Sequence, residues 1–169
     1  GGDRPGDNLF SDSIVAVDIK SGERKWHYQL THHDIWDWDI PAASVLADLP
    51  NGNKVLMSVT KQSWVYTFDR ETGEPIWPIE ELPVPIGDVP GEWYSPTQPI
   101  PSIPAPFDRQ GFTEDDLIDW TPEIKALALE AIEGFRLSPS VYSPPSLQDA
   151  ADGTRGTLGL PSATGGANW

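Results

Sequence analysis

The 169-residue sequence contains no cysteine at all. This absence excludes a disulfide framework, a thiolate zinc site and a cysteine nucleophile within the chain. Basic residues are also scarce, since 11 lysines and arginines stand against 26 aspartates and glutamates, for a net charge of −15. Nucleic acids and anionic membranes are bound through basic surfaces, so neither is an expected partner. No apolar run approaches the about 20 residues that a membrane-spanning helix needs, and no signal peptide is recognisable.

The length permits one ordinary domain, but the two ends predict an internal part of a longer protein. The sequence begins at Gly1 without an initiator methionine, and it ends in a glycine-rich turn that leads into Trp169. Any association with a membrane is expected to depend on segments outside it.

Two segments, 16–26 and 67–77, align without gaps. Both read Asp, two variable residues, Ser or Thr, Gly, three variable residues and Trp, and the tryptophans Trp26 and Trp77 are 51 positions apart. This pattern predicts a β-hairpin, in which the aspartate hydrogen-bonds the backbone of the turn and the glycine supplies a positive φ angle. Short strands are expected at 15–17 and 65–68. Each tryptophan is expected on the returning strand, facing a neighbouring element.

Two copies of one motif at a period near 50 residues are typical of a β-propeller. Further strands are expected at 25–30, 42–47 and 54–60. A blade takes about four strands, so we predict an all-β chain that forms about two to three blades. Such a piece leaves open sheet edges, so we do not expect it to fold stably alone. The alternative is two unrelated hairpins that share only a type of turn.

The middle of the chain has a different composition. Eight prolines fall in the 24 residues 83–106, which predicts an extended surface loop rather than a central strand. An acidic helical turn is expected at 113–116, and a helix is expected to start with Thr121 as N-cap and Pro122 as first residue. One face of this helix is apolar at helical spacing and consists of Ile124, Leu127, Ala128, Ala131, Ile132 and Phe135.

The predicted organisation has three parts. Residues 1–82 carry both repeats and form blades, residues 83–140 form the proline-rich and helical insertion, and residues 141–169 begin a further blade. We expect the helix to pack on the outside of the propeller. A helix that binds a partner is the alternative.

The segment 32–41, HHDIWDWDIP, contains many side chains that can bind metals or transfer protons, within only ten residues. It holds two imidazoles, two indoles and the carboxylates of Asp34, Asp37 and Asp39. Indoles usually pack away from water, so we expect them to place the carboxylates in a partly desolvated setting, which raises a carboxylate's pKa. A general base or a metal ligand is made in this way. The alternative is an acidic surface loop whose tryptophans cap a core.

These motifs together resemble the dehydrogenases that depend on pyrroloquinoline quinone (PQQ), which are eight-bladed propellers with the cofactor on the central axis. The tryptophan repeat is similar to their W-motif. The segment 32–41, which stands six residues after Trp26, is similar to a block of the glucose and polyol branch. Further similar blocks follow in the same order and cover nearly the whole chain, at 61–70, 83–85, 95–99, 142–146, 156–158 and 165–169.

The resemblance implies roles for five residues. Asp37 stands where the family has its proposed general base, which removes the hydroxyl proton as hydride moves from the carbinol carbon to the quinone. Asp37 and Asp39 are the implied ligands of a metal, Ca²⁺ or else Mg²⁺ or a lanthanide. Lys61 matches the cation that reaches the quinone oxygens and stabilises their negative charge. Asn168 and Trp169 match cofactor-contacting positions. The resemblance places the remaining metal ligands and the tryptophan under the cofactor outside this chain, so the chain alone is expected to be inactive.

The implied activity is oxidation of a sugar, polyol or alcohol by a periplasmic enzyme, and the resemblance is compatible with an inner-membrane anchor elsewhere in the protein. Electrons would pass to a quinone or to cytochrome c. His33 and Asp34 are expected either to orient Asp37 or contact substrate, or to hydrogen-bond within the loop. Two other functions stay open: a non-enzymatic scaffold built from the same tryptophan repeats, and a calcium-dependent hydrolase on a propeller.

Overall fold

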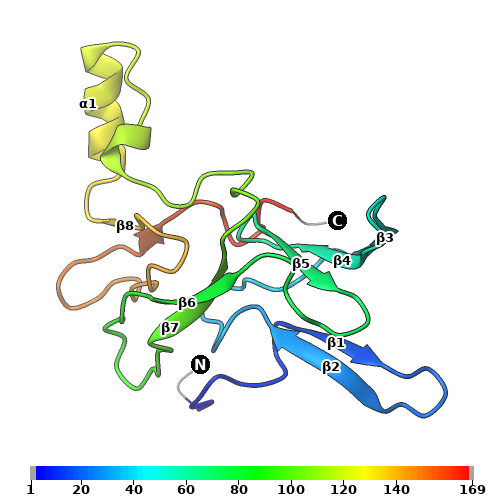
Figure 1. Cartoon of the computed structure of the whole chain (residues 1–169). Helices are drawn as coiled ribbons and strands as arrows, with labels where there is room; N and C mark the ends of the chain where they lie inside the picture. The colour runs from blue at the N-terminus through cyan, green and yellow to red at the C-terminus, as the bar shows by residue number, and fades with distance from the viewer. Residues whose placement is uncertain (1–2, 168–169) are drawn as a thin grey trace.

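The computed structural model describes residues 3–167 (Figure 1). Its strands form small sheets rather than one large sheet: β1–β2, β3–β4–β5, β6–β7 and β8–β9. The elements, in chain order, are β1 Ser13–Val17, β2 Arg24–Gln29, β3 Val45–Asp48, β4 Lys54–Val59, β5 Val65–Asp69, β6 Ile79–Pro83, β7 Thr97–Pro101, η1 Glu114–Asp116, α1 Pro122–Ala131, β8 Arg136–Leu137 and β9 Thr157–Leu158. Over the described residues, no helix has the length and apolar character needed to cross a bilayer.

The turns of the two repeats have the predicted chemistry. Asp18 Oδ1 accepts hydrogen bonds from the backbone N–H groups two and three residues ahead, at 3.0 and 2.9 Å. Asp69 Oδ1 does the same in the second copy, at 2.9 Å for both. Gly22 and Gly73 have φ angles of 73° and 79°, which a residue with a side chain adopts only at a cost. Both turns are therefore specified locally, by an aspartate and a glycine.

The tryptophan of the first repeat packs on the turn of the second. Trp26 lies on β2, is 9% exposed, and donates its indole N–H to the backbone oxygen of Arg70 at 3.1 Å. Its ring lies so close to Gly73 that a Cβ atom there would be 2.6 Å away. Trp77 differs, because it follows a single bridge between Phe68 and Pro75 rather than lying on a strand, and it is 38% exposed. The expectation of a returning strand is thus confirmed for the first copy and wrong for the second.

The core lies where β2, β4 and β5 meet the residues that follow α1. The three-stranded sheet buries Val55, Tyr66 and Phe68 completely. The predicted strand at 54–60 is confirmed by β4, while the strand expected at 42–47 begins only at Val45. The core cluster consists of Trp26, Leu30, Trp38, Leu56, Trp64, Tyr66, Phe68, Val141 and Tyr142. Two segments far apart in the sequence, the loop after β2 and the turn at 141–142, therefore share one core.

Part of the proline-rich stretch is a strand, which corrects the prediction of a loop throughout. The strand β7 pairs antiparallel with β6 and contains Pro99 and Pro101, opposite Glu81 and Ile79. Among the described residues β7 has this one partner strand. In an edge strand every second N–H points away from the partner, so prolines at alternate positions cost no ladder hydrogen bond.

The helix begins as predicted but does not pack as predicted. Thr121 is its N-cap, with Oγ1 accepting from the N–H of Ile124 at 3.3 Å, and Pro122 is its first residue. None of the helical residues is buried, and Leu127 of the apolar face is 65% exposed. Figure 1 shows α1 projecting away from the sheets. The expected packing of this face on the outside of the propeller is not seen within the described residues, where Ile132 and Phe135 only border a hollow with Leu137 of β8.

Candidate functional site

The loop 32–41 is built around the side chain of Asp34. Its Oδ1 accepts from the backbone N–H of Trp36 at 2.8 Å, and its Oδ2 accepts from the backbone N–H of Trp38 at 2.6 Å. Asp37, between these two residues, has a φ of 70°. Burial raises the pKa of Asp34, the two N–H donors lower it, and the charges of Asp39 and Asp37 raise it further. Asp34 is thus the carboxylate of the loop that shows the predicted desolvation.

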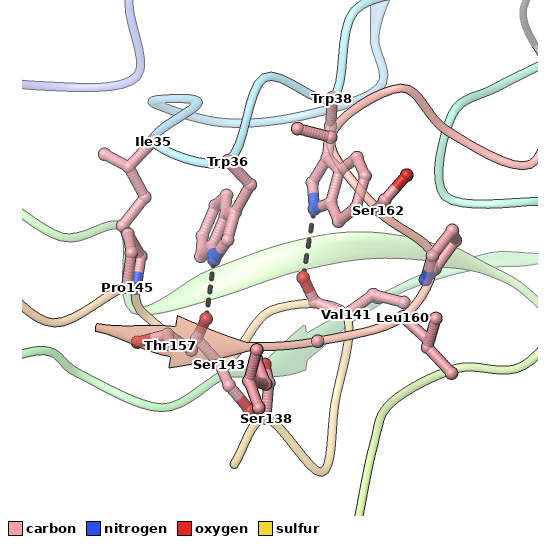
Figure 2. A pocket seen from close by; sticks show the side chains of 14 residues that line it. Ile35, Trp36, Trp38, Ser138, Val141, Ser143, Pro145, Thr157, Leu160 and Ser162 are labelled. Atoms are coloured by element: carbon pink, nitrogen blue, oxygen red, sulfur yellow. Dashed lines mark hydrogen bonds between the residues drawn. The ribbon is translucent and has the colours of Figure 1, made fainter. Parts of the chain in front are cut away.

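The two indoles of the loop point into the protein. Figure 2 shows Trp36 donating to the backbone oxygen of Ser143 and Trp38 donating to that of Val141, at 2.8 and 3.0 Å. They border a hollow of about 360 Å³ whose other walls come from 138–145 and 157–163. Trp38 is 4% exposed and belongs to the core. The tryptophans therefore cap a core, as the alternative interpretation of this segment held.

Asp37 and Asp39 remain at the surface of the described chain, with side chains 64% and 55% exposed. The expected desolvation is wrong for these two carboxylates. The physical reason is that both indole N–H groups are satisfied by carbonyls at 141 and 143, so the rings cover that segment instead of the carboxylates. The two aspartates are accessible to a ligand.

Lys61 joins these two aspartates. Its Nζ donates to Asp37 Oδ2 at 2.9 Å and to Asp39 Oδ2 at 2.8 Å, although its own side chain is only 8% exposed. Burial by itself lowers the pKa of Lys61, but the hydrogen bonds and charges of Asp39 and Asp37 outweigh it, and the pKa is raised. A fixed ammonium charge thus lies beneath two exposed carboxylates. The predicted base and the predicted cation, 24 residues apart in sequence, are in direct contact.

The position of Lys61 is set by its neighbours. It follows β4 in the short connection to β5. The N–H of Gly166 donates to its backbone oxygen at 2.9 Å. A Cβ at Gly165, whose φ is 83°, would lie 2.5 Å from Lys61 Cγ. The start of the predicted cofactor-contacting block is therefore adjacent to Lys61, while Asn168 and Trp169 lie outside the described residues.

A fourth carboxylate, that of Asp12, lies beside the loop and was not predicted. Asp12, Asp34 and Asp39 each place one carboxylate oxygen within 4.8 Å of the others. Burial, followed by the charge of Asp34, raises the pKa of Asp12 to about 6. The metal prediction named Asp37 and Asp39, and the structure brings only Asp39 into this group. No motif marks Asp12, which precedes β1 and reaches the loop through the fold alone.

The two histidines tie the loop to other segments. His33 is 1% exposed, with Nδ1 2.9 Å from the backbone oxygen of Gly6 and Nε2 3.1 Å from Glu92 Oε1. His32 Nε2 lies 3.0 Å from Glu81 Oε1. His33 therefore neither hydrogen-bonds within the loop nor reaches solvent in the described chain. Its ring holds the loop against the proline-rich segment.

Sequence reasoning missed one further support of the loop. The side chain of Gln98, fully buried on β7, accepts from the N–H of His32 at 2.8 Å and donates to its carbonyl at 2.7 Å. The two hydrogen bonds satisfy both backbone groups of His32, as a neighbouring β-strand would. Gln98 lies in the block 95–99 that carries the family resemblance, but the block assigns it no role, and its contact with His32 depends on the pairing of β6 and β7.

Comparison with known proteins gives a consistent result over the whole sequence. A family model of PQQ proteins, described as the glucose/ethanol/alcohol dehydrogenase β-propeller domain, matches residues 1–169. The quinate/shikimate dehydrogenase (quinone) of Acinetobacter baylyi is 32% identical over 174 residues, which cover 100% of this chain and 20% of that protein.

Two other relatives act on other substrates by name. The quinoprotein glucose dehydrogenase A of Acinetobacter calcoaceticus is 33% identical, over 100% of this chain and 21% of that protein. The glycerol dehydrogenase large subunit of Gluconobacter thailandicus is 40% identical, over 59% of this chain and 15% of that protein. The chain thus spans about a fifth of the length of the curated relatives that match all of it.

Proposed function

Because this chain belongs to the β-propeller family of the PQQ-dependent glucose, ethanol and alcohol dehydrogenases, we propose that it forms one wall of such an enzyme's active site. The proposed reaction oxidises the CH–OH group of a sugar, polyol or alcohol. One observation carries the assignment of residues to this reaction. It is the buried ammonium of Lys61, which contacts the exposed carboxylates of Asp37 and Asp39.

Asp37 is proposed as the general base. Oxidation of a carbinol removes a proton from oxygen and a hydride from carbon, and the carboxylate of Asp37 is accessible to a substrate hydroxyl. PQQ, when bound, supplies the acceptor for the hydride. The ammonium of Lys61 has three N–H donors, and in the described chain the two carboxylates take two of them. The third is proposed to donate to a quinone oxygen, and Asn168 and Trp169 are proposed to contact the same cofactor.

Asp37 and Asp39 are proposed to hold a metal ion, Ca²⁺ or alternatively Mg²⁺ or a lanthanide. The donor chemistry suits such a cation, because hard cations prefer carboxylate oxygen. Asp39 also lies within 4.8 Å of a carboxylate oxygen of Asp12, so a cation there would offset closely spaced negative charges. Burial is the main cause of the raised pKa of Asp12, and the charges of Asp34 and Asp39 raise it further.

The remaining parts of the proposal concern the whole protein. We propose a periplasmic location and electron transfer to a quinone or to cytochrome c. The relatives are named for quinate, glucose and glycerol, which supports a small polyhydroxylated substrate without choosing among them. The net charge of −15 disfavours nucleic acid as a partner.

The test uses the complete protein that contains this segment, expressed in a periplasm and supplied with PQQ and calcium, and then with a lanthanide. Reduction of a redox dye is followed with glucose, glycerol and ethanol. Asp37→Asn is expected to lower kcat by about 10²- to 10⁴-fold while PQQ remains bound. Asp115→Asn, which alters an exposed carboxylate of η1, is the matched control and should retain the parent rate.

Two outcomes would overturn the proposal. Unchanged turnover in Asp37→Asn would remove Asp37 as the base. A well-folded protein that neither binds PQQ nor reduces the dye would instead support the alternative function, a non-enzymatic scaffold built from tryptophan repeats.

A further inference from the structure

The side chain of Asp34 is hydrogen-bonded to the backbone on both sides of Asp37. One carboxylate oxygen accepts from the residue before Asp37 and the other from the residue after it, at 2.8 and 2.6 Å. Hydrogen bonds to an ionised carboxylate are about twice as strong as those between neutral groups. Asp37, at a φ of 70°, lies in a backbone region that residues with side chains rarely adopt. The conformation of Asp37 is therefore held by its neighbours.

The two residues to which Asp34 is hydrogen-bonded are themselves anchored to a separate segment. The indoles of Trp36 and Trp38 are anchored to the backbone oxygens of Ser143 and Val141, as Figure 2 shows. The ring of Trp36 also meets the ring of Tyr142 edge-on, at 5.2 Å between centroids. Since both flanking side chains are fixed to a separate segment, loss of the Asp34 bonds would free chiefly the peptide units around Asp37.

Asp34 is poorly suited to act on a substrate directly. Both of its oxygens already accept hydrogen bonds from the loop, and its side chain is partly buried. The ammonium of Lys61 bonds to Asp37 and Asp39 rather than to Asp34. The influence of Asp34 on the chemistry therefore has to pass through the backbone of Asp37.

We propose that Asp34 is a positioning residue of the reaction, which holds the carboxylate of Asp37 in the orientation that meets Lys61 and the substrate hydroxyl. This inference rests on the proposed function, because it presumes that Asp37 is the base. The inference gives the two aspartates of one motif different roles. Asp37 accepts the proton, and Asp34 holds the carboxylate of Asp37 in place.

The test compares Asp34→Asn with a matched variant, Asp69→Asn, in the complete protein loaded with PQQ and calcium. Both substitutions remove the negative charge of a side chain that accepts hydrogen bonds from two backbone N–H groups of a turn. Asp69, however, lies in a repeat hairpin. Asp34→Asn is expected to lower kcat by up to about 10²-fold, the effect of a displaced catalytic group, with KM and bound PQQ within about threefold of the parent. Asp69→Asn should leave kcat per bound PQQ unchanged.

A second background separates positioning from a purely structural role. In Asp37→Asn, whose base is already absent, adding Asp34→Asn should leave the residual kcat within about twofold. An equal loss in both backgrounds would mean that Asp34 supports the fold rather than the base. A higher calcium requirement for activation in Asp34→Asn would make it a metal ligand. Either result overturns the inference.

The inference and the proposed function can fail separately. If Asp37→Asn is inactive and Asp34→Asn retains the parent kcat, only the positioning role is lost. If Asp37→Asn retains the parent kcat, the assignment of the base is lost, and the role of Asp34 with it.

Discussion

The two tryptophan repeats have the same turn and different surroundings. In both, an aspartate accepts from two backbone N–H groups and a glycine has a φ between 73° and 79°. In the first copy the tryptophan is buried against the second copy's glycine, whereas Trp77 of the second copy is 38% exposed. A repeated sequence thus specifies a repeated local structure, while burial depends on which element lies next to it.

The largest expected contrast between the copies concerns the tryptophans. Trp26→Ala removes a buried indole and should lower the free energy of unfolding of the complete protein by about 3–5 kcal/mol. Trp77→Ala should cost only about 1–2 kcal/mol, because part of its side chain is already in contact with solvent. Urea unfolding of both variants measures the difference. An equal loss would mean that Trp77 is covered by a part of the protein outside the described residues.

The next contrast concerns the glycines of the two turns. A Cβ at Gly73 would lie 2.6 Å from the ring of Trp26, whereas nothing lies within 4 Å of the corresponding position at Gly22. Both alanine variants should lose about 1–2 kcal/mol through the positive φ, and Gly73→Ala should lose a further roughly 1–3 kcal/mol through overpacking. The same unfolding measurement tests this. Equal losses would show that the indole moves aside without cost.

The smallest expected effect comes from the aspartates of the two turns, and here the copies should agree. Backbone N–H donors lower the pKa of Asp18 and of Asp69 below 3.8. A carboxyl whose folded pKa is lowered contributes stability above its unfolded value, and this is lost as the pH falls through the folded pKa. Asp18→Asn and Asp69→Asn should therefore both be slightly less stable than the parent near pH 7. The difference should shrink below about pH 4, and a clear inequality between the variants would mean that the turns are not equivalent.

Much of the local structure could be predicted because it depends on neighbours in the sequence. The repeat turns, the strand at 54–60 and the N-cap at Thr121 all follow from residues a few positions apart. The segment 32–41 was likewise recognisable, since its composition and its order after a W-motif are both visible in the sequence. The family assignment rested on such blocks, and the match over residues 1–169 confirms it.

The features that prediction missed depend on distant contacts. The strand β7 required a partner at 79–83 before its prolines could be tolerated. The apolar face of α1 indicated packing, but a periodic pattern does not reveal whether any element covers it. Asp12 reaches the acidic group of the site from outside every motif.

The candidate site shows which features the sequence determines and which depend on the tertiary structure. The sequence alone determined which residue types are available: three aspartates and two tryptophans in one loop, and a lysine after a later strand. Only the tertiary structure decided that Lys61 bonds to Asp37 and Asp39, which precede it by 24 and 22 residues. Asp34 instead bonds to the backbone two and four residues ahead, as in a local turn. The physical reason is that turns and caps form between residues close in the chain. The partners of a buried charge are instead selected by the packing of segments that are far apart in sequence.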